Sequence, residues 1–155
     1  MNEGDSAHLP PVPPEPLSPG SVMLKFDQII PGVPYQELVP CYHFRIHTQA
    51  SPNLGHINFR VGDTEHVRVC VGHIGFQIDE EFRGHGHALQ ACLAIAPFVR
   101  SIYDTETLTC DPDNHASLRT IERFGARFID EVEVPAHDVH CKSGTRRKRR
   151  YRWSP

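Results

Sequence analysis

This 155-residue sequence has no long apolar run, no closely spaced pair of cysteines and no basic segment in its first residues. No apolar stretch is long enough to span a bilayer, and residues 1–5 have neither the basic nor the apolar part of a signal peptide. The five cysteines are odd in number, widely scattered and without a C-x-x-C pair, which disfavours a disulfide framework or a cysteine-based zinc site. We therefore expect a cytoplasmic protein with reduced thiols and no membrane partner.

Charge and proline are unevenly distributed along the chain. The formal net charge is −3, yet a basic run near the C-terminus stands against an otherwise acidic protein; its members are Arg146, Arg147, Lys148, Arg149, Arg150 and Arg152. Residues 1–20 are rich in proline and have few large apolar groups, so burial cannot offset their ordering entropy. We expect a disordered tail over 1–20 and a single domain over 21–155, a length sufficient for one core.

Alternation of apolar and polar residues predicts seven strands, over 22–30, 41–47, 54–61, 67–78, 107–110, 126–134 and 145–153. The turn-rich segment 62–66 predicts a hairpin between the third and fourth strands. If this hairpin closes symmetrically, His56 lies opposite His73 on one face of the sheet.

Two helices are predicted between the later strands. The first carries one apolar stripe, made by Leu89, Cys92, Leu93 and Ala96. It starts near Gly86, and Pro97 should kink or end it. For the second helix, Asn114 is a good N-cap and Gly125 suits the C-terminal cap. The order of elements indicates an α+β fold with a mixed sheet.

The glycine-rich turn between the fourth strand and the first helix is the most informative stretch. In a strand–turn–helix arrangement, several backbone N–H groups and the positive end of the helix dipole point to one place. This geometry favours binding of a pyrophosphate. Here Arg83-x-x-Gly86-x-Ala88 resembles the R/Q-x-x-G-x-G/A signature of the GNAT acyltransferases. A second segment, Asn114-His115-Ala116-Ser117 followed by Phe124-Gly125-Ala126, resembles the part of that fold after the fifth strand.

The resemblance implies a GNAT-like, mostly antiparallel twisted sheet of about seven strands with two main helices. It also implies acetyl-CoA or another short acyl-CoA as co-substrate. Separately, we expect no metal. The implied CoA contacts are Phe76, Gln77, Ile78, Arg83, Gly84, His85, Gly86, His87, Ala88, Asn114 and Ser117. A Rossmann site fits poorly because the downstream β-α repeat and the ribose-binding acid are absent, and a P-loop is excluded because no Gly-Lys-Ser/Thr follows.

The catalytic groups are less well marked. Many family members have a tyrosine in the second helix, four residues before the glycine that follows it, and this tyrosine acts as the acid for the leaving thiol. This sequence has Ile121 at that position. For the base we consider His73 and His56, because two facing imidazoles depress each other's protonation and leave a neutral base near pH 7. The alternative is that both are polar residues on a solvated sheet face or hydrogen-bonded residues that fill space.

Two further features have ordinary interpretations. His137, His140 and Cys141 form a compact cluster, but a zinc site there needs a fourth ligand that the sequence does not name. The basic run is most simply a last strand whose cations discourage edge pairing, which disfavours nucleic acid as a partner.

The link between the first two strands is too short and proline-rich for the two helices that GNAT folds usually insert there. The acceptor groove should therefore be open on that side or closed by a second copy of the chain in a homodimer. We expect an N-acyltransferase, with N-acetyl transfer favoured, that moves the acyl group directly to a small-molecule or peptide amine. The alternatives are a non-catalytic acyl-CoA sensor of the same fold and a nucleic-acid-binding module.

Overall fold

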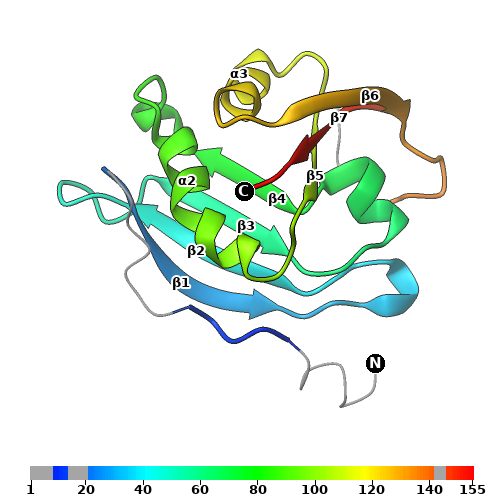
Figure 1. Ribbon diagram of the computed structural model, residues 1–155, viewed down its shortest axis with the longest axis horizontal. Coiled ribbons are helices and arrows are strands. Elements are labelled where there is room, and N and C mark those ends of the chain that lie inside the picture. The colour runs from blue at the N-terminus through cyan, green and yellow to red at the C-terminus, as the bar shows by residue number, and fades with distance from the viewer. Residues whose placement is uncertain (1–8, 14–20, 142–145) are drawn as a thin grey trace.

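The computed structural model describes residues 9–13, 21–141 and 146–155 (Figure 1). Seven strands form two sheets: β1 (Met23–Ile30), β2 (Cys41–His47), β3 (Gly55–Arg60) and β4 (Ile74–Ile78) in the first, and β5 (Glu106–Cys110), β7 (Arg147–Trp153) and β6 (Arg127–Glu133), in that spatial order, in the second. The α-helices are α2 (His87–Arg100) and α3 (His115–Arg123), and the shorter helices are η1 (Pro34–Gln36), η2 (His66–Val71) and η3 (Glu80–Phe82). The α+β class, seven strands and two main helices are as predicted, and no α-helix separates β1 from β2.

The core lies between the first sheet and α2. In β2 the alternation seen in the sequence puts Tyr42, Phe44 and Ile46 inside, and all three are buried. The Phe98 ring of α2 packs edge-on against Tyr42 and Phe44, with ring centroids 5.3 and 6.1 Å away. This burial explains why α2 continues through Pro97 to Arg100 rather than ending there: the core contacts of Phe98 and its neighbours outweigh one lost backbone hydrogen bond.

The strand predicted over 67–78 is wrong in its first half. Residues 66–71 form η2, a π-helix, and only 74–78 form β4. The alternation of Val67, Val69 and Val71 resembles a strand, but η2 packs beside β5, where the Thr109 hydroxyl donates to the Cys70 carbonyl at 2.5 Å. The longer connection changes the register of the β3–β4 pair.

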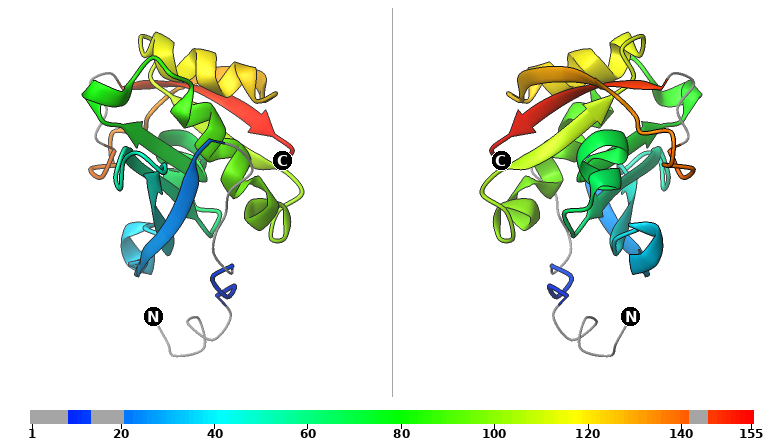
Figure 2. Two further views of the ribbon diagram at one scale, coloured as in Figure 1. Left: turned by 90° about the vertical axis from the view of Figure 1, so that its left-hand side faces the viewer. Right: turned by 90° about the vertical axis from the view of Figure 1, so that its right-hand side faces the viewer.

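The two sheets meet at one point and separate from there. The His73 N–H group donates to the Thr107 carbonyl at 2.8 Å, which joins the start of β4 to β5. Beyond this contact β4 pairs only with β3, and β5 pairs only with β7, among the strands described. The two strands therefore diverge, and we call the space between β4 and β5 the wedge. Figure 2 shows the two sheets from two further sides.

Part of the proline-rich segment lies against the domain. The Tyr42 hydroxyl donates to the Pro10 carbonyl, and Val12 packs against the core. In Figure 1 this segment runs below β1. The rest of the predicted tail, residues 1–8 and 14–20, lies outside the described residues. Among the described helices, none is both long and apolar enough for a membrane span.

The expectation that all cysteines are reduced is wrong for two of them. Cys70 in η2 and Cys141 after β6 form a disulfide, with their Cα atoms 5.7 Å apart. The two residues are 71 positions apart in the chain, so only the folded arrangement reveals the pair. Cys41, Cys92 and Cys110 are free and buried.

Candidate active site

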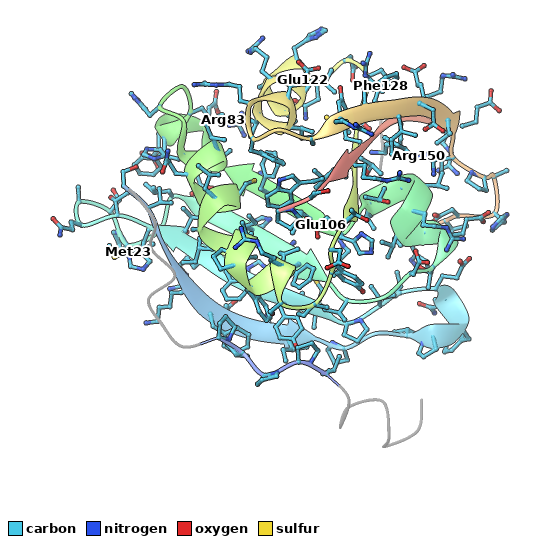
Figure 3. The ribbon with its side chains drawn as sticks, viewed as in Figure 1. Met23, Arg83, Glu106, Glu122, Phe128 and Arg150 are labelled. Carbon is cyan, nitrogen blue, oxygen red and sulfur yellow. A yellow bond between two sulfur atoms is a disulfide. The ribbon has the colours of Figure 1, made fainter. Side chains whose placement is uncertain are left out.

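The glycine turn stands where the sequence places it, between β4 and α2. Gly84 and Gly86 have φ angles of 86° and 76°, a left-handed conformation that other residues adopt only with strain. The Arg83 side chain anchors the turn, because its Nε donates to the Ile78 carbonyl at the end of β4 at 2.8 Å. Figure 3 shows Arg83 beside the tip of this turn. Since the first N–H groups of α2 have no intrahelical partner, they remain available to an anion.

A cavity of about 560 Å³ opens at this turn. It is lined by all the residues predicted to contact CoA except His85, which is exposed. Two cations in the lining, Arg119 and Arg123 of α3, were not predicted from the sequence. Their i, i+4 spacing puts them on one helix face. Because Asn114 marks the start of this helix, the sequence alone could have predicted that the two arginines lie together. With Arg83 they form a cationic lining suited to a ligand with several phosphates.

The edge of β4 that borders the wedge offers backbone groups to a ligand. Backbone groups of successive strand residues point to opposite sides of the strand. The Arg60 N–H donates to the His73 carbonyl and the Asp79 N–H to the Leu54 carbonyl, so the odd-numbered residues of β4 bond to β3. The N–H and C=O groups of Phe76 therefore face the wedge. Such an edge can pair with an extended ligand that carries amides, as an additional strand would.

The N-terminus of α3 forms the opposite wall. The Asn114 side chain caps this helix by accepting from the Ser117 N–H at 3.3 Å, as its sequence position predicts. Ser117 is half-buried and lies on the first turn of the helix, directly over the wedge. Asn114 and Ser117 are thus brought together with β4 although they are more than thirty positions away in the sequence.

A second cavity, of about 310 Å³, continues from the first. The two share Phe76, Asn114 and Ser117, so these residues mark the junction. The second cavity is lined by charged residues from several elements, among them Asp111 and Lys148, whose side chains form a 2.6 Å ion pair. Ile121, at the tyrosine position of many family members, is buried in its wall.

Arg60 closes the second cavity from β3. Its guanidinium donates to the carbonyls of Val71 and Gly72, both at 3.3 Å, and burial lowers its pKa. A Cβ at Gly75 would lie 3.1 Å from this guanidinium, so the glycine makes room for the arginine across the strand pair. The cavity therefore has a fixed cation in its wall.

The Cys110 thiol lines the second cavity, 3.8 Å from the carbonyl oxygen of the junction residue Asn114, and it is not a ready nucleophile. Burial raises its pKa to about 11, with the neighbouring carboxylate of Asp111 adding to the effect. At neutral pH the thiol is therefore almost entirely protonated. This favours direct transfer between two substrates over an acyl-cysteine intermediate.

The predicted pairing of His56 with His73 is wrong. The observed register puts His56 opposite Gln77 and Asn58 opposite Gly75, because η2 takes up residues that a symmetric hairpin would have paired. The neighbouring imidazole of His56 is that of His43 on β2, with ring centroids 5.1 Å apart. Burial and the nearby His43 lower the pKa of His56. Neither ring is in the lining of the two cavities.

His73 joins the two sheets instead of facing the cavities. Its Nδ1 accepts from the Thr107 N–H at 3.0 Å, its Nε2 donates to the Gly62 carbonyl at 3.0 Å, and its ring lies 4.9 Å from that of Tyr103. Burial lowers the pKa of His73, which keeps the neutral ring that this pair of contacts requires. Both ring nitrogens are occupied, so no lone pair remains to take a proton from an amine.

We expect His73→Ala to reduce stability rather than catalysis. The substitution leaves the buried Thr107 N–H without its acceptor and removes ring packing, at a cost of roughly 2–4 kcal/mol in the free energy of unfolding. Denaturant unfolding measures this loss, and His56→Ala, on the half-exposed sheet face, is the control, with a change within about 0.5 kcal/mol. A folded His73→Ala protein of unchanged stability and strongly reduced turnover would restore the catalytic interpretation.

Most of the basic run forms the strand β7, and two of its arginines pair with carboxylates of β6. Arg150 makes a bidentate pair with Asp130, both contacts at 2.7 Å, and this hydrogen bonding lowers the pKa of the carboxyl. Arg147 contacts Glu131 at 2.9 Å, and the Arg149 guanidinium lies 4.3 Å from the centre of the Phe128 ring. Figure 3 shows Phe128 and Arg150 on these adjacent strands. Local neutralisation weakens the case for a nucleic-acid partner.

Comparison with known proteins identifies the family of this chain. The family model described as an acetyltransferase (GNAT) domain matches residues 7–127, most of the chain, so the chain belongs to the GNAT acetyltransferase family. Acetyltransferases of this family use acetyl-CoA, and their transfer reaction needs no metal. No curated protein matches the sequence.

Solved structures show the same fold. The microcin C7 self-immunity acetyltransferase MccE, in complex with acetyl-CoA and AMP, aligns at 17% identity with a TM-score of 0.57, over 74% of this chain and 61% of that one. RimL, a ribosomal L7/L12 alpha-N-protein acetyltransferase in complex with coenzyme A, aligns at 17% identity with a TM-score of 0.58, over 74% and 62%. A GNAT-family acetyltransferase from Bacillus anthracis aligns at 21% identity with a TM-score of 0.56, over 72% and 65%. The chain thus spans about six tenths of the length of these proteins.

Proposed function

We propose that this protein is an N-acyltransferase that moves an acetyl or other short acyl group from acyl-CoA directly to a primary amine. The observation that carries the proposal is the continuous wedge between β4 and β5. One end has a glycine turn and three arginines suited to phosphates, and the other end has a separate polar cavity of about 310 Å³ for an acceptor. The two substrates would meet at Phe76, Asn114 and Ser117.

Each wall of the wedge has a distinct task in this proposal. Backbone N–H groups of residues 83–88 bind the pyrophosphate, and Arg119 and Arg123 neutralise further phosphate charge. The open edge of β4 aligns the pantetheine arm, with the Phe76 N–H as a donor to the oxyanion that forms during transfer. The protonated Cys110 thiol leaves the amine as the only nucleophile.

The wedge supports a direct test with purified protein. Calorimetry should show acetyl-CoA binding in the micromolar range, about −8 kcal/mol. Thiol release should then follow when amino acids, polyamines, aminoglycosides or peptides are offered. Absence of heat with both CoA and acetyl-CoA would contradict the proposal.

Ser117 takes the place of the missing tyrosine as donor to the leaving thiolate in this scheme. It lines both cavities, whereas Ile121 cannot donate a proton. We expect Ser117→Ala to lower kcat about tenfold with little change in the KM for acyl-CoA, a modest effect because CoA thiolate is a fair leaving group. Thr120→Ala is the matched control, since Thr120 is on the same helix but lines only the first cavity. Equal effects of the two substitutions would remove Ser117 from the mechanism.

An acyl-CoA sensor is the second candidate, and Ile121 is the observation that favours it. A sensor binds the thioester in the same wedge but releases no thiol with any amine. The calorimetric and thiol-release measurements therefore separate the two functions on the same protein sample.

A further inference from the structure

A small apolar cluster outside the main core joins two distant parts of the chain. It consists of Cys70, Val134 and Cys141, with Val71 packed against it. The cluster connects η2 to the loop between β6 and β7. Because a cluster of this size buries little apolar area, another interaction must hold the loop in position.

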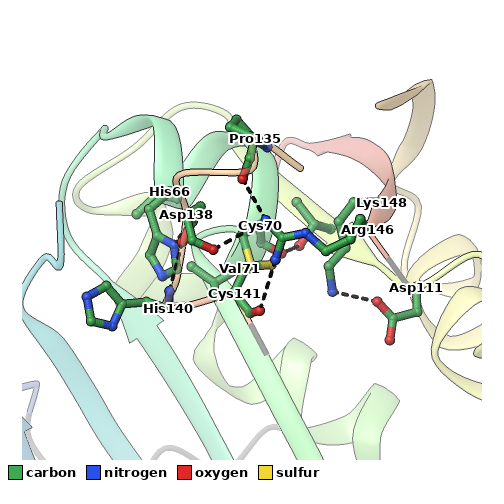
Figure 4. Close-up of a disulfide and its surroundings, with 12 residues drawn as sticks. His66, Cys70, Val71, Asp111, Pro135, Asp138, His140, Cys141, Arg146 and Lys148 are labelled. Carbon is green, nitrogen blue, oxygen red and sulfur yellow. Dashed lines mark hydrogen bonds and ion pairs between the residues drawn. A yellow bond between two sulfur atoms is a disulfide. The ribbon is translucent and has the colours of Figure 1, made fainter. Parts of the chain in front are cut away.

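Metal-binding groups converge at this cluster. The His66 Nδ1 and the Asp138 Oδ2 are 2.7 Å apart, and the two side chains are 8% and 9% exposed. Ligand atoms of His66, Cys70 and Asp138 all lie within 4.8 Å of one another, and the Cys141 sulfur is bonded to that of Cys70. Figure 4 shows His66 and Asp138 meeting beside the two cysteines. A single ion could therefore reach four donors of three chemical types with small side-chain movements.

We propose that, with the disulfide reduced, Cys70, Cys141, His66 and Asp138 bind one zinc-type divalent metal ion. Thiolate and imidazole ligands are preferred by zinc, and four protein ligands make a closed, tetrahedral, structural site. Of the sequence cluster His137, His140 and Cys141, only Cys141 is a ligand in this site, and His137 instead contacts the Glu65 carboxylate at 3.0 Å. Two of the other ligands, His66 and Cys70, come from η2. The spacings, His66-x-x-x-Cys70 and Asp138-x-x-Cys141, suit two short chelating segments.

The disulfide and the metal are alternative links between the same two segments. A dithiol or phosphine reductant supplies two electrons, and two protons convert the disulfide to two thiols. Metal binding then releases both thiol protons, because the thiolate is the ligand. The ion takes no part in acyl transfer in this proposal. It fixes the loop whose residue His140 lines the second cavity.

Cobalt titration tests the site without any activity measurement. Protein reduced with a phosphine should bind one equivalent of Co²⁺ with a thiolate-to-cobalt charge-transfer band and the strong visible bands of tetrahedral cobalt. Zn²⁺ should displace the cobalt, and the disulfide form should show neither band. Reduced, folded protein that shows no charge-transfer band would overturn the proposal.

Variants distinguish this site from adventitious binding. Cys141→Ser should weaken Co²⁺ binding about a hundredfold and Asp138→Asn about tenfold, whereas His137→Ala and Cys41→Ser should bind as the parent protein does. If Cys141→Ser does not fold, Zn²⁺ protection of wild-type thiols gives the same answer: zinc should shield two of the five from a thiol reagent. Loss of cobalt binding in His137→Ala, or no zinc protection of Cys70 and Cys141, would place any ion elsewhere.

Discussion

Gly86→Trp is expected to abolish acyl-CoA binding while the protein stays folded. Gly86 has a positive φ and is the N-cap of α2, so any side chain there incurs strain of about 1 kcal/mol. A Cβ added at this position meets nothing within 4 Å, so an indole there does not clash at its base with the protein. It extends instead into the cavity of about 560 Å³ and occupies the space proposed for the pyrophosphate.

The expected size of this effect is large. Binding should change from micromolar to beyond millimolar, which corresponds to about 4 kcal/mol or a thousandfold. Calorimetry with acetyl-CoA measures the loss, and circular dichroism with thermal unfolding confirms the fold.

The chain offers a closely matched control in Gly125. This residue follows α3, has a φ of 95°, and also has open space where a Cβ would lie, but it is not in the lining of either cavity. Gly125→Trp should incur similar strain and bind acetyl-CoA normally. If both variants lose binding equally, the effect is on folding and the glycine turn is not the CoA site.

Local patterns in the sequence were sufficient to predict the secondary-structure elements that form much of this site. The turn, the start of α2 and the Asn114 cap depend on residues close together in the chain, so glycine positions and N-cap preference identify them. The i, i+4 spacing of Arg119 and Arg123 belongs to the same class of signal.

Contacts between distant segments were not predictable in the same way. The histidine pairing failed because Val67, Val69 and Val71 alternate like a strand, while packing of η2 beside β5 makes them helical. This change from strand to helix shifts the β3–β4 register, so each residue of β4 has a different cross-strand neighbour from the one predicted. The Cys70–Cys141 pair and the donors around it depend on the position of the loop after β6, which no local pattern encodes.

Because of Glu106, we expect the free energy of unfolding to fall markedly as pH rises from acid to slightly alkaline values. This residue begins β5, is 3% exposed, and neither carboxylate oxygen has a hydrogen-bond partner among the described residues. Figure 3 labels it at the start of its strand. Burial raises its pKa to about 8, against 4.5 for an unperturbed glutamate.

The direction of this pH dependence follows from the number of protons that the folded and unfolded states bind. Between pH 4.5 and 8 the folded protein retains the Glu106 proton, while the unfolded chain has released it. Stability therefore falls by about 1.4 kcal/mol per pH unit through this window, and the total loss approaches roughly 4–5 kcal/mol above it. The lowered pKa values of His56 and His73 act in the opposite direction, because there the unfolded chain binds more protons.

Comparison with Glu106→Gln isolates this contribution from that of the histidines. The amide has nearly the same shape and no charge, so the unfolding free energy of the variant should lack the decline due to residue 106. The difference between the two proteins should change by about 1.4 kcal/mol for each pH unit from 5 to 8 in urea unfolding. Glu81→Gln, at an exposed position, is the control and should follow the wild-type profile. Parallel profiles for wild type and Glu106→Gln would contradict a raised pKa for the Glu106 carboxyl.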